Sequence, residues 1–194
     1  MPVDIIEPIQ TRRLSLRPLA TSDADLLFAL FAHWSVIEHL SAPPWPYRLV
    51  DMRDFVGTLL GATEPDREIF RVVMRDGKPI GGISQRHRLA SNLQSGAGPN
   101  IGYWLGQRYW GQGYMTEAVI ALAHHIFATS DVDAIYSGAF AENTASLRVQ
   151  SKSGFAHDGE TVLHSNPKKT PLAHVNTVRN RQTPPFVPRS GKSP

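Results

Sequence analysis

The chain of 194 residues is long enough for one domain with a hydrophobic core of its own. Hydrophobic residues make up 41% of the sequence and charged residues 19%, a balance that predicts a globular protein folding in water. Because cysteine is absent, disulfide bonds, thiolate nucleophiles and cysteine-ligated zinc are excluded.

The positive charge is concentrated at the C-terminal end. The formal net charge is +3, and residues 179–194 alone hold four basic residues and no acidic one, so residues 1–178 carry −1. We therefore expect a single domain over residues 1–178 and a flexible, proline-rich basic tail over residues 179–194. A nearly neutral domain does not favour nucleic acid as a partner.

The first ten residues, MPVDIIEPIQ, lack the basic start and the long apolar run of a secretory signal. No stretch of the sequence is long and apolar enough to span a bilayer, so a membrane is not an expected partner either. We expect a cytoplasmic protein that is a monomer or a homodimer.

The N-terminal part predicts one strand and two helices. Residues 12–19 alternate apolar and polar side chains, as a strand does, and Pro18 marks its end. Ser22 or Asp23 can cap the next helix, whose expected apolar face comprises Leu26, Leu27, Leu30 and Phe31. Three prolines exclude a helix over residues 41–47, and a second helix is predicted over residues 51–60.

The central part predicts a hairpin and then a strand that leads into a helix. Residues 68–74 and 78–85 are rich in strand-forming residues and are joined by Asp76-Gly77, a pair that tolerates positive φ. After a loop over residues 86–100 and a strand over residues 100–105, an amphipathic helix is expected to bury Met115, Ala118, Val119, Leu122, Ala123 and Ile126.

The C-terminal part predicts a strand over residues 134–140, a short helix over residues 143–153 and strands over residues 155–163 and 172–178. This order of elements predicts a mixed α/β sheet with antiparallel and parallel parts.

The stretch RYWGQGYMTEA, residues 108–118, connects the strand at 100–105 to its helix and contains Gly111 and Gly113. The start of a helix has unpaired N–H groups and a partial positive charge, so bare glycines there let backbone amides bind an anion such as phosphate. Arg108 would add charge. Taken alone, however, the two glycines favour a plain turn that binds nothing.

Other phosphate-binding loops fit this stretch poorly. The pattern GxxxxGK[ST] is absent, and Thr116 stands where a dinucleotide fingerprint has its third glycine, which disfavours nucleoside triphosphates and NAD. The stretch resembles the acyl-CoA loop of the GNAT N-acetyltransferases, whose pattern Arg/Gln-x-x-Gly-x-Gly/Ala is met by Arg108, Gly111 and Gly113. The wider segment IGYWLGQRYWGQGYMTEA and the early RLSLRPL are similar to the RimJ/RimL-type branch of that family.

This resemblance implies a GNAT-like α/β (α+β) fold, with a mostly antiparallel central sheet flanked by helices and the acyl-CoA loop between the fourth strand and the third helix. It also implies acetyl-CoA as co-substrate, held at its pyrophosphate by the loop amides, and no metal. The residues expected to bind acetyl-CoA are Tyr103, Trp104, Leu105, Arg108, Gly111, Gln112, Gly113, Tyr114, Met115, Asn143 and Ser146.

The segment AENTASLRVQSKSGF, residues 141–155, is by spacing alone an N-capped helix closed by a glycine. It also matches the Asn-x-x-Ser…Gly-Phe pattern of RimJ/RimL-type enzymes through Asn143, Ser146 and Gly154-Phe155. Carried over, the match implies that Asn143 bonds the pantetheine arm of the cofactor. Ser146 would then lie close to the thioester sulfur, where its hydroxyl either assists departure of the thiol or has only a positional role.

The general base departs from the family pattern. Many relatives carry a glutamate where this chain has Asn100, and many others carry a tyrosine where it has Gln150. Glu68, Glu117 and Glu142 remain, of which Glu117 is expected to cap or pack at the helix start. The lack of a strong base favours an acceptor amine of low pKa, such as a peptide N-terminus, over a polyamine.

The expected activity is therefore the transfer of an acyl group, acetyl above all, to a primary amine of a protein N-terminus or a small molecule. The alternative is a GNAT-like module that binds CoA without turnover. Trp45, Tyr47 and Asn100 are the residues expected in the acceptor pocket, although Trp45 and Tyr47 fit a rigid loop that caps the core equally well.

Overall fold

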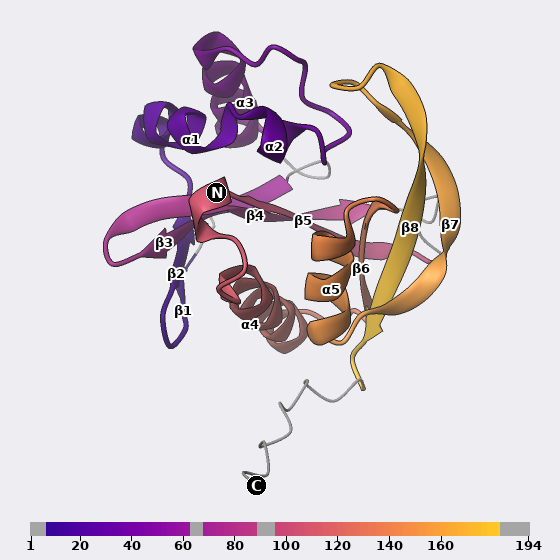
Figure 1. Cartoon of the computed structure of the whole chain (residues 1–194). Coiled ribbons are helices and arrows are strands. Elements are labelled where there is room, and N and C mark those ends of the chain that lie inside the picture. The colour runs from indigo at the N-terminus through magenta and orange to yellow at the C-terminus, as the bar shows by residue number, and fades with distance from the viewer. Residues whose placement is uncertain (1–6, 63–67, 89–95, 183–194) are drawn as a thin grey trace, which may run out of the picture.

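The computed structural model describes residues 7–62, 68–88 and 96–182. Its centre is a sheet in the order β1-β2-β3-β4-β5-β6-β8-β7, in which β5 and β6 pair in parallel and every other neighbouring pair is antiparallel (Figure 1). The strands are β1 (Ile9–Gln10), β2 (Ser15–Pro18), β3 (Glu68–Arg75), β4 (Lys78–Arg88), β5 (Gly98–Leu105), β6 (Ala134–Phe140), β7 (Ala156–Ser165) and β8 (Thr170–Asn180). The prediction of a mixed, mostly antiparallel sheet is confirmed.

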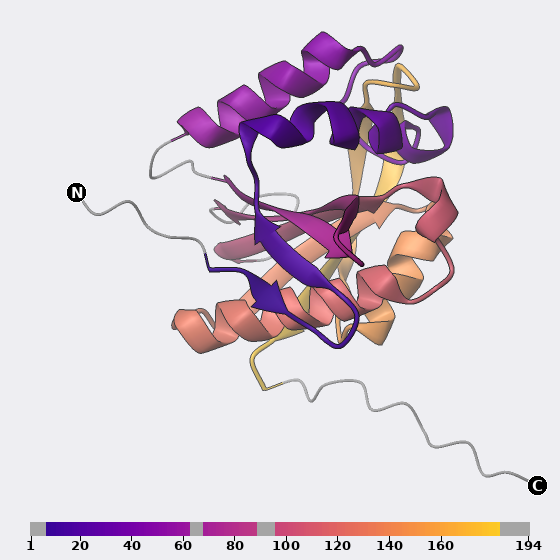
Figure 2. The ribbon, with the colours of Figure 1, turned by 90° about the vertical axis from the view of Figure 1, so that its left-hand side faces the viewer.

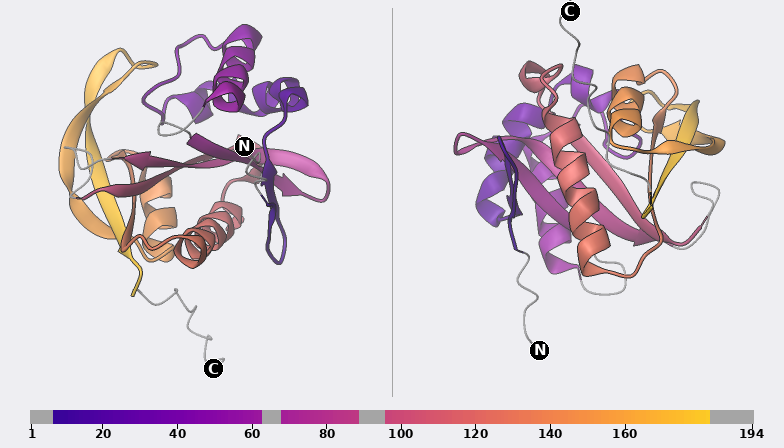
Figure 3. Two further views of the ribbon diagram at one scale, coloured as in Figure 1. Left: turned by 180° about the vertical axis from the view of Figure 1, so that it is seen from behind. Right: turned by 90° about the horizontal axis from the view of Figure 1, so that it is seen from below.

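Helices cover both faces of this sheet (Figures 1 and 2). They are α1 (Ala24–Phe31), α2 (Trp34–Ile37), α3 (Leu49–Gly61), α4 (Tyr114–Thr129) and α5 (Thr144–Lys152), with short 3-10 turns η1 (Thr21–Asp23) and η2 (Gln107–Tyr109). The first three helices lie on one face, and α4 and α5 lie on the other, where α4 runs along the sheet beside α5 (Figure 3).

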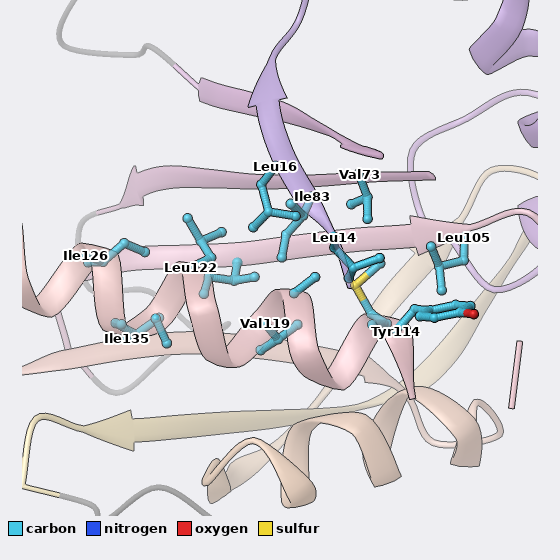
Figure 4. Packing of buried hydrophobic residues seen from close by; sticks show 14 of the residues in the cluster. Leu14, Leu16, Val73, Ile83, Leu105, Tyr114, Val119, Leu122, Ile126 and Ile135 are labelled. Carbon is cyan, nitrogen blue, oxygen red and sulfur yellow. The ribbon is translucent and has the colours of Figure 1, made fainter. Parts of the chain in front are cut away.

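Each face has its own apolar cluster. Between the sheet and α4, residues from segments far apart in the sequence pack together, as Figure 4 shows for Leu14, Ile83, Leu122 and Ile135. All six residues predicted for the apolar face of α4 are buried. On the opposite face, α1 and α3 pack against β3 around Leu27, Met52 and Val72. Burial of this kind holds the start of α4 at a fixed place beside β5.

The predicted hairpin is present as β3 and β4. Its turn residues Asp76 and Gly77 have φ of 48° and 72°, the left-handed values that the sequence pair tolerates.

The strands β5 and β6 pair at a single position, Asn100 with Tyr136. One residue farther along, the Ser137 hydroxyl donates to the Ile101 carbonyl at 2.9 Å. No further backbone ladder joins these two strands in the described part of the chain, so they separate toward Leu105 and Phe140.

Some N-terminal predictions were wrong. The sequence did not predict β1 or α2, and Leu26 is 55% exposed although it was expected on the apolar face of α1. Asp23 is the N-cap residue of α1, but its side chain makes no capping hydrogen bond. Its carboxylate instead accepts the Ala20 N–H at 2.8 Å and pairs with Arg17 at 2.6 Å.

The predicted boundary at residue 178 falls inside a strand. β8 continues to Asn180, and Arg179, which composition assigned to the basic tail, is 2% exposed. Arg181 donates to the carbonyls of Phe127 and Ser130 at 2.6 Å each. The composition of the end of the chain did not reveal that its first residues pair with β6. Residues 183–194 lie outside the described residues. None of the described helices is long and apolar enough to cross a membrane.

Candidate functional site

The glycine loop leads from the end of β5 through η2 into the start of α4. Gly111 and Gly113 have φ of 73° and 76°, and Gly113 is the N-cap of α4. A Cβ at Gly111 would meet nothing within 4 Å, so there is open space beside this residue. The first helical bond runs from the Glu117 N–H to the Gly113 carbonyl at 3.1 Å, and the amides of residues 114–116 precede it. This helix start has the chemistry of an anion seat.

Glu117 braces this loop against the N-terminal strands. Its carboxylate accepts the Thr11 hydroxyl at 2.7 Å, the Arg13 N–H at 2.9 Å and the Arg13 guanidinium at 2.6 Å. Burial alone would raise the pKa of Glu117, but the bonds from Thr11 and Arg13 outweigh it and lower that pKa. Arg13 also donates to the Gln112 carbonyl at 3.1 Å. The structural role expected for Glu117 is confirmed.

A cavity of about 350 Å³ opens between the starts of α4 and α5; we call it the helix cavity. Nine of the eleven residues expected to bind acetyl-CoA line it: Tyr103, Trp104, Leu105, Gly111, Gly113, Tyr114, Met115, Asn143 and Ser146. Arg108 and Gln112 are exposed and lie outside this lining, and the Arg108 guanidinium stands 4.9 Å from the Tyr109 ring. Two cations that the sequence did not single out, Arg148 and Lys152, line the cavity from α5.

The start of α5 forms the inner wall of this cavity. Asn143 caps the helix by accepting the Ser146 N–H on Oδ1 at 3.0 Å, as its spacing predicted. The Tyr103 hydroxyl, which reaches over from β5, lies 2.9 Å from the Ser146 hydroxyl and 3.2 Å from the Ser146 carbonyl oxygen. Burial raises the pKa of the Tyr103 phenol, so it stays protonated and can donate.

Gln150 completes this network from inside the protein. It is 1% exposed, accepts the Thr177 hydroxyl on Oε1 at 2.9 Å and donates from Nε2 to the Ser146 hydroxyl at 3.3 Å. The residue that replaces the expected tyrosine therefore orients Ser146.

A second cavity of about 280 Å³, which we call the strand cavity, lies where β5 and β6 separate. The described residues that line it include Asn100 of β5, Gly138 of β6 and His174 of β8. It shares His39, Leu40, Tyr103, Asn143 and Ser146 with the helix cavity, so the two cavities meet at Ser146. No aspartate or glutamate is among the described lining residues.

Two histidines of the strand cavity were not predicted as site residues. Nδ1 of His39 is buried without a hydrogen-bond partner, and His174 Nδ1 lies 2.9 Å from Asn176 Oδ1. Burial lowers the pKa of His174 more than its bond to Asn176 raises it. A single histidine in a sequence does not indicate a functional site. Only the fold brings His39, from the segment after α2, and His174, from β8, to one cavity.

Other candidates lie apart from both cavities. Tyr47 packs edge-on against Phe31 with ring centroids 4.9 Å apart, and burial raises its pKa to about 12. Trp45 packs on Trp34 at 5.1 Å. Neither Trp45 nor Tyr47 lines the two cavities, and their role toward an acceptor stays a prediction.

The two remaining glutamates are held in ion pairs. Glu68 pairs with Arg86 at 3.0 Å, and Glu142 contacts Lys168. Neither glutamate lines the two cavities. Among the described residues, no group of three or more His, Cys, Asp or Glu side chains is placed to hold a metal ion.

Comparison with known proteins identifies relatives of this arrangement. The sequence profile of the acetyltransferase (GNAT) domain matches residues 13–156. The uncharacterized N-acetyltransferase p20 of Bacillus licheniformis is 25% identical over 156 residues, which are 79% of this chain and 85% of that protein.

Solved structures share the fold. The ribosomal L7/L12 alpha-N-protein acetyltransferase RimL, in complex with coenzyme A, is similar with a TM-score of 0.75 and 20% identity over 92% of this chain and all of that one (100%). The microcin C7 self-immunity acetyltransferase MccE, in complex with acetyl-CoA and AMP, is similar with a TM-score of 0.74 and 17% identity over 88% of this chain and 93% of that one.

Proposed function

The chain belongs to the GNAT family of acetyltransferases, and from this premise we propose that it transfers the acetyl group of acetyl-CoA to a primary amine by direct attack in a ternary complex. The observation that carries the proposal is the open glycine loop, whose free amides at the start of α4 face the same cavity as Asn143 and Ser146. Acetyl-CoA-bound or CoA-bound proteins of the same fold support it.

The helix cavity would hold acetyl-CoA. Its pyrophosphate fits the free amides near Gly111 and Gly113, and Arg148 and Lys152 supply positive charge nearby. The pantetheine arm would then run past Asn143, whose Oδ1 is used by the cap while its Nδ2 has no role in capping. This path brings the thioester to Ser146, where the strand cavity begins.

The chemistry requires a neutral amine, a donor for the developing oxyanion and a proton for the leaving sulfur. Backbone N–H groups near the end of β5, over residues 103–105, are our candidates for the oxyanion donor. Ser146 and the Tyr103 phenol, in contact at 2.9 Å, are the candidates for assisting the leaving thiol. Sequence reasoning named Ser146 for this role and missed the phenol, since nothing local predicts that the two side chains meet.

The acceptor would occupy the strand cavity. Because no aspartate or glutamate is among its described lining residues, the cavity offers nothing to pair with the extra positive charges of a polyamine or an aminoglycoside. At pH 7, deprotonating a lysine-like amine costs roughly 4–5 kcal/mol, whereas an α-amine costs about 1 kcal/mol. Both arguments favour an α-amine, of a peptide N-terminus or an amino acid derivative, as the acceptor.

An acetyl-CoA-binding module without turnover is the second candidate, because Asn100 and Gln150 hold the places for which the family resemblance implies acid–base residues. Two measurements separate the candidates. Calorimetry with acetyl-CoA tests binding, and thiol release with a panel of alaninamide, a short peptide with a free N-terminus, free amino acids, spermidine and kanamycin tests turnover, with mass spectrometry of the product. Absence of acetyl-CoA binding would reject both candidates, and steady turnover of any amine would exclude the inactive module.

A further inference from the structure

His174 occupies a place in the strand cavity that the sheet prepares for an imidazole. It lies on β8 opposite Phe140 of β6, with Asn176 two residues farther along opposite Gly138. A Cβ at Gly138 would lie 2.3 Å from His174 Cε1 and 3.0 Å from Nε2. Any other residue at position 138 would therefore displace the ring, so the glycine leaves the space that the imidazole fills.

The partner of the ring fixes which nitrogen is free. Asn176 is 4% exposed, and its Oδ1 accepts the Nδ1–H of His174 at 2.9 Å. With the proton of the neutral ring on Nδ1, Nε2 carries the lone pair. Among the described residues no hydrogen bond to Nε2 occurs, and the ring lines the cavity. After protonation both N–H groups are satisfied, Nδ1–H by Asn176 and Nε2–H by the contents of the cavity.

The other titratable groups around the cavity are less suited to accept a proton. His39 lines the cavity from the segment after α2, but its buried Nδ1 has no hydrogen-bond partner among the described residues that would orient the ring as Asn176 orients His174. The Tyr103 phenol, on β5, has a raised pKa. Glu38 and Glu142 contact Lys168, and Glu160, on β7, lies 3.7 Å from His157; none of these five lines the cavity.

We propose that His174, oriented by Asn176, is the general base that removes the proton from the acceptor ammonium in the strand cavity. The inference rests on the proposed function. It assigns the general base, which the sequence does not identify because Asn100 and Gln150 occupy the positions at which the family pattern has acid–base residues.

The proton balance of the reaction is complete with this assignment. Nε2 of His174 takes one proton from the ammonium, directly or through one water, and the freed lone pair forms the C–N bond to the thioester carbonyl carbon. The C–S bond then breaks, and the thiolate receives the second proton of the amine, passed on by the Ser146–Tyr103 pair. The amide keeps the third proton, and His174 releases its proton to water.

The environment of His174 keeps it ready for this step. Burial lowers its pKa, so the ring is neutral at pH 7 and its Nε2 lone pair is available. The pKa of this base lies closer to that of an α-amine, about 7.7–8.0, than to that of a lysine-like amine, about 10.4, in agreement with an α-amine as the acceptor.

Three variants test the proposal with the best amine of the panel, at saturating acetyl-CoA and acceptor, where kcat reports the groups of the bound complex. The wild type should lose kcat on acidification, and this acidic limb of its pH profile should have a pKa below the usual 6.5 of histidine. His174→Gln should lower kcat at pH 7 by about 10²-fold or more and abolish this limb. Asn176→Asp should move the limb to higher pH, because a carboxylate beside Nδ1 favours the imidazolium. His157→Gln, at a histidine of β7 that lines neither cavity, is the control and should keep the acidic limb.

Calorimetry on the same proteins separates the possible failures. His174 does not line the helix cavity, so His174→Gln should bind acetyl-CoA with the wild-type affinity, which also shows that it folds. Nuclear magnetic resonance of the histidine Cε1–H groups, assigned by loss of one signal in His174→Gln, should show the His174 pKa rising in Asn176→Asp. A wild type that neither binds acetyl-CoA nor turns over any amine would overturn the proposed function. A wild type that turns over while His174→Gln keeps its rate and acidic limb, or while His157→Gln loses them, would overturn the assignment of His174 alone.

Discussion

Asn143 serves two purposes at the start of α5 that substitution can separate. Its Oδ1 caps the helix by accepting the Ser146 N–H at 3.0 Å, and its side-chain amide is proposed to donate to the pantetheine arm. Alanine removes both functions. Serine is about as good an N-cap as asparagine but has no amide group, and its shorter side chain does not reach as far into the helix cavity.

The structure sets the expected size of each effect. Loss of an N-cap costs about 1 kcal/mol, which for a domain of this size lowers Tm by about 2–4 °C. Loss of one neutral hydrogen bond to the ligand costs about 0.5–1.5 kcal/mol, or about 2- to 10-fold in affinity for acetyl-CoA. Asn143→Ala should show both losses, whereas Asn143→Ser should keep Tm and lose only affinity.

Differential scanning calorimetry gives Tm, and isothermal titration calorimetry gives the dissociation constant of acetyl-CoA. Thr144→Gly would loosen the same turn at an exposed residue that lines neither cavity, and it serves as a control for helix fraying. If Asn143→Ser binds acetyl-CoA as tightly as the wild type, the residue is a helix cap alone, and the path proposed for the pantetheine arm is incorrect.

Three further substitutions test other parts of the site. Gly111→Ala places a methyl group on a residue with left-handed backbone, which costs about 1–2 kcal/mol of conformational strain, and it crowds the proposed phosphate site. Affinity for CoA should therefore fall, while affinity for acetyl-pantetheine, which has no pyrophosphate, should be unchanged. Equal losses for both ligands would contradict the proposed phosphate site. Glu117→Gln should destabilise the protein by about 2 kcal/mol at pH 7. Because the pKa of Glu117 is lowered in the folded state, this stabilisation is present above the unfolded-state pKa and is lost as the pH falls through the folded-state pKa. The free energies of unfolding of wild type and variant, measured in urea, should therefore converge in acid. A difference between them that does not depend on pH would refute the charge-based account. Tyr103→Phe should lower kcat by about 10²-fold with little change in the KM for acetyl-CoA, and an unchanged kcat would leave Ser146 without the phenol as a partner in thiol departure.

The parts of the fold that sequence predicted are those with strong local signals. The hairpin at Asp76-Gly77, the apolar face of α4 and the capped helix after Asn143 follow from turn chemistry, periodicity and capping, which act over a few residues. The errors arose where tertiary packing decides. Leu26 satisfies the helical period but faces water, and Arg179 looks like part of a basic tail but pairs in β8, because a partner strand outweighs local composition.

The site divides in the same way. The sequence groups the glycine loop with Asn143 and Ser146, because these belong to two continuous segments whose order can be matched to a family, and the structure brings both segments to the helix cavity. The charges at the helix cavity were assigned to Arg108, whereas Arg148 and Lys152 line it, since side-chain direction on α5 depends on how that helix packs.

The candidate acid–base residues of the site could not be identified from the order of the sequence. A phenol was expected late in α5, where Gln150 stands, but a phenol reaches the same helix from β5, and Gln150 holds Ser146 toward it. A base was expected near Asn100, and the strand cavity that Asn100 lines also receives His174, because the sheet places β8 next to β6. Residues 74 positions apart thus line one cavity, and the chemistry of that cavity depends on strand order rather than on any single motif.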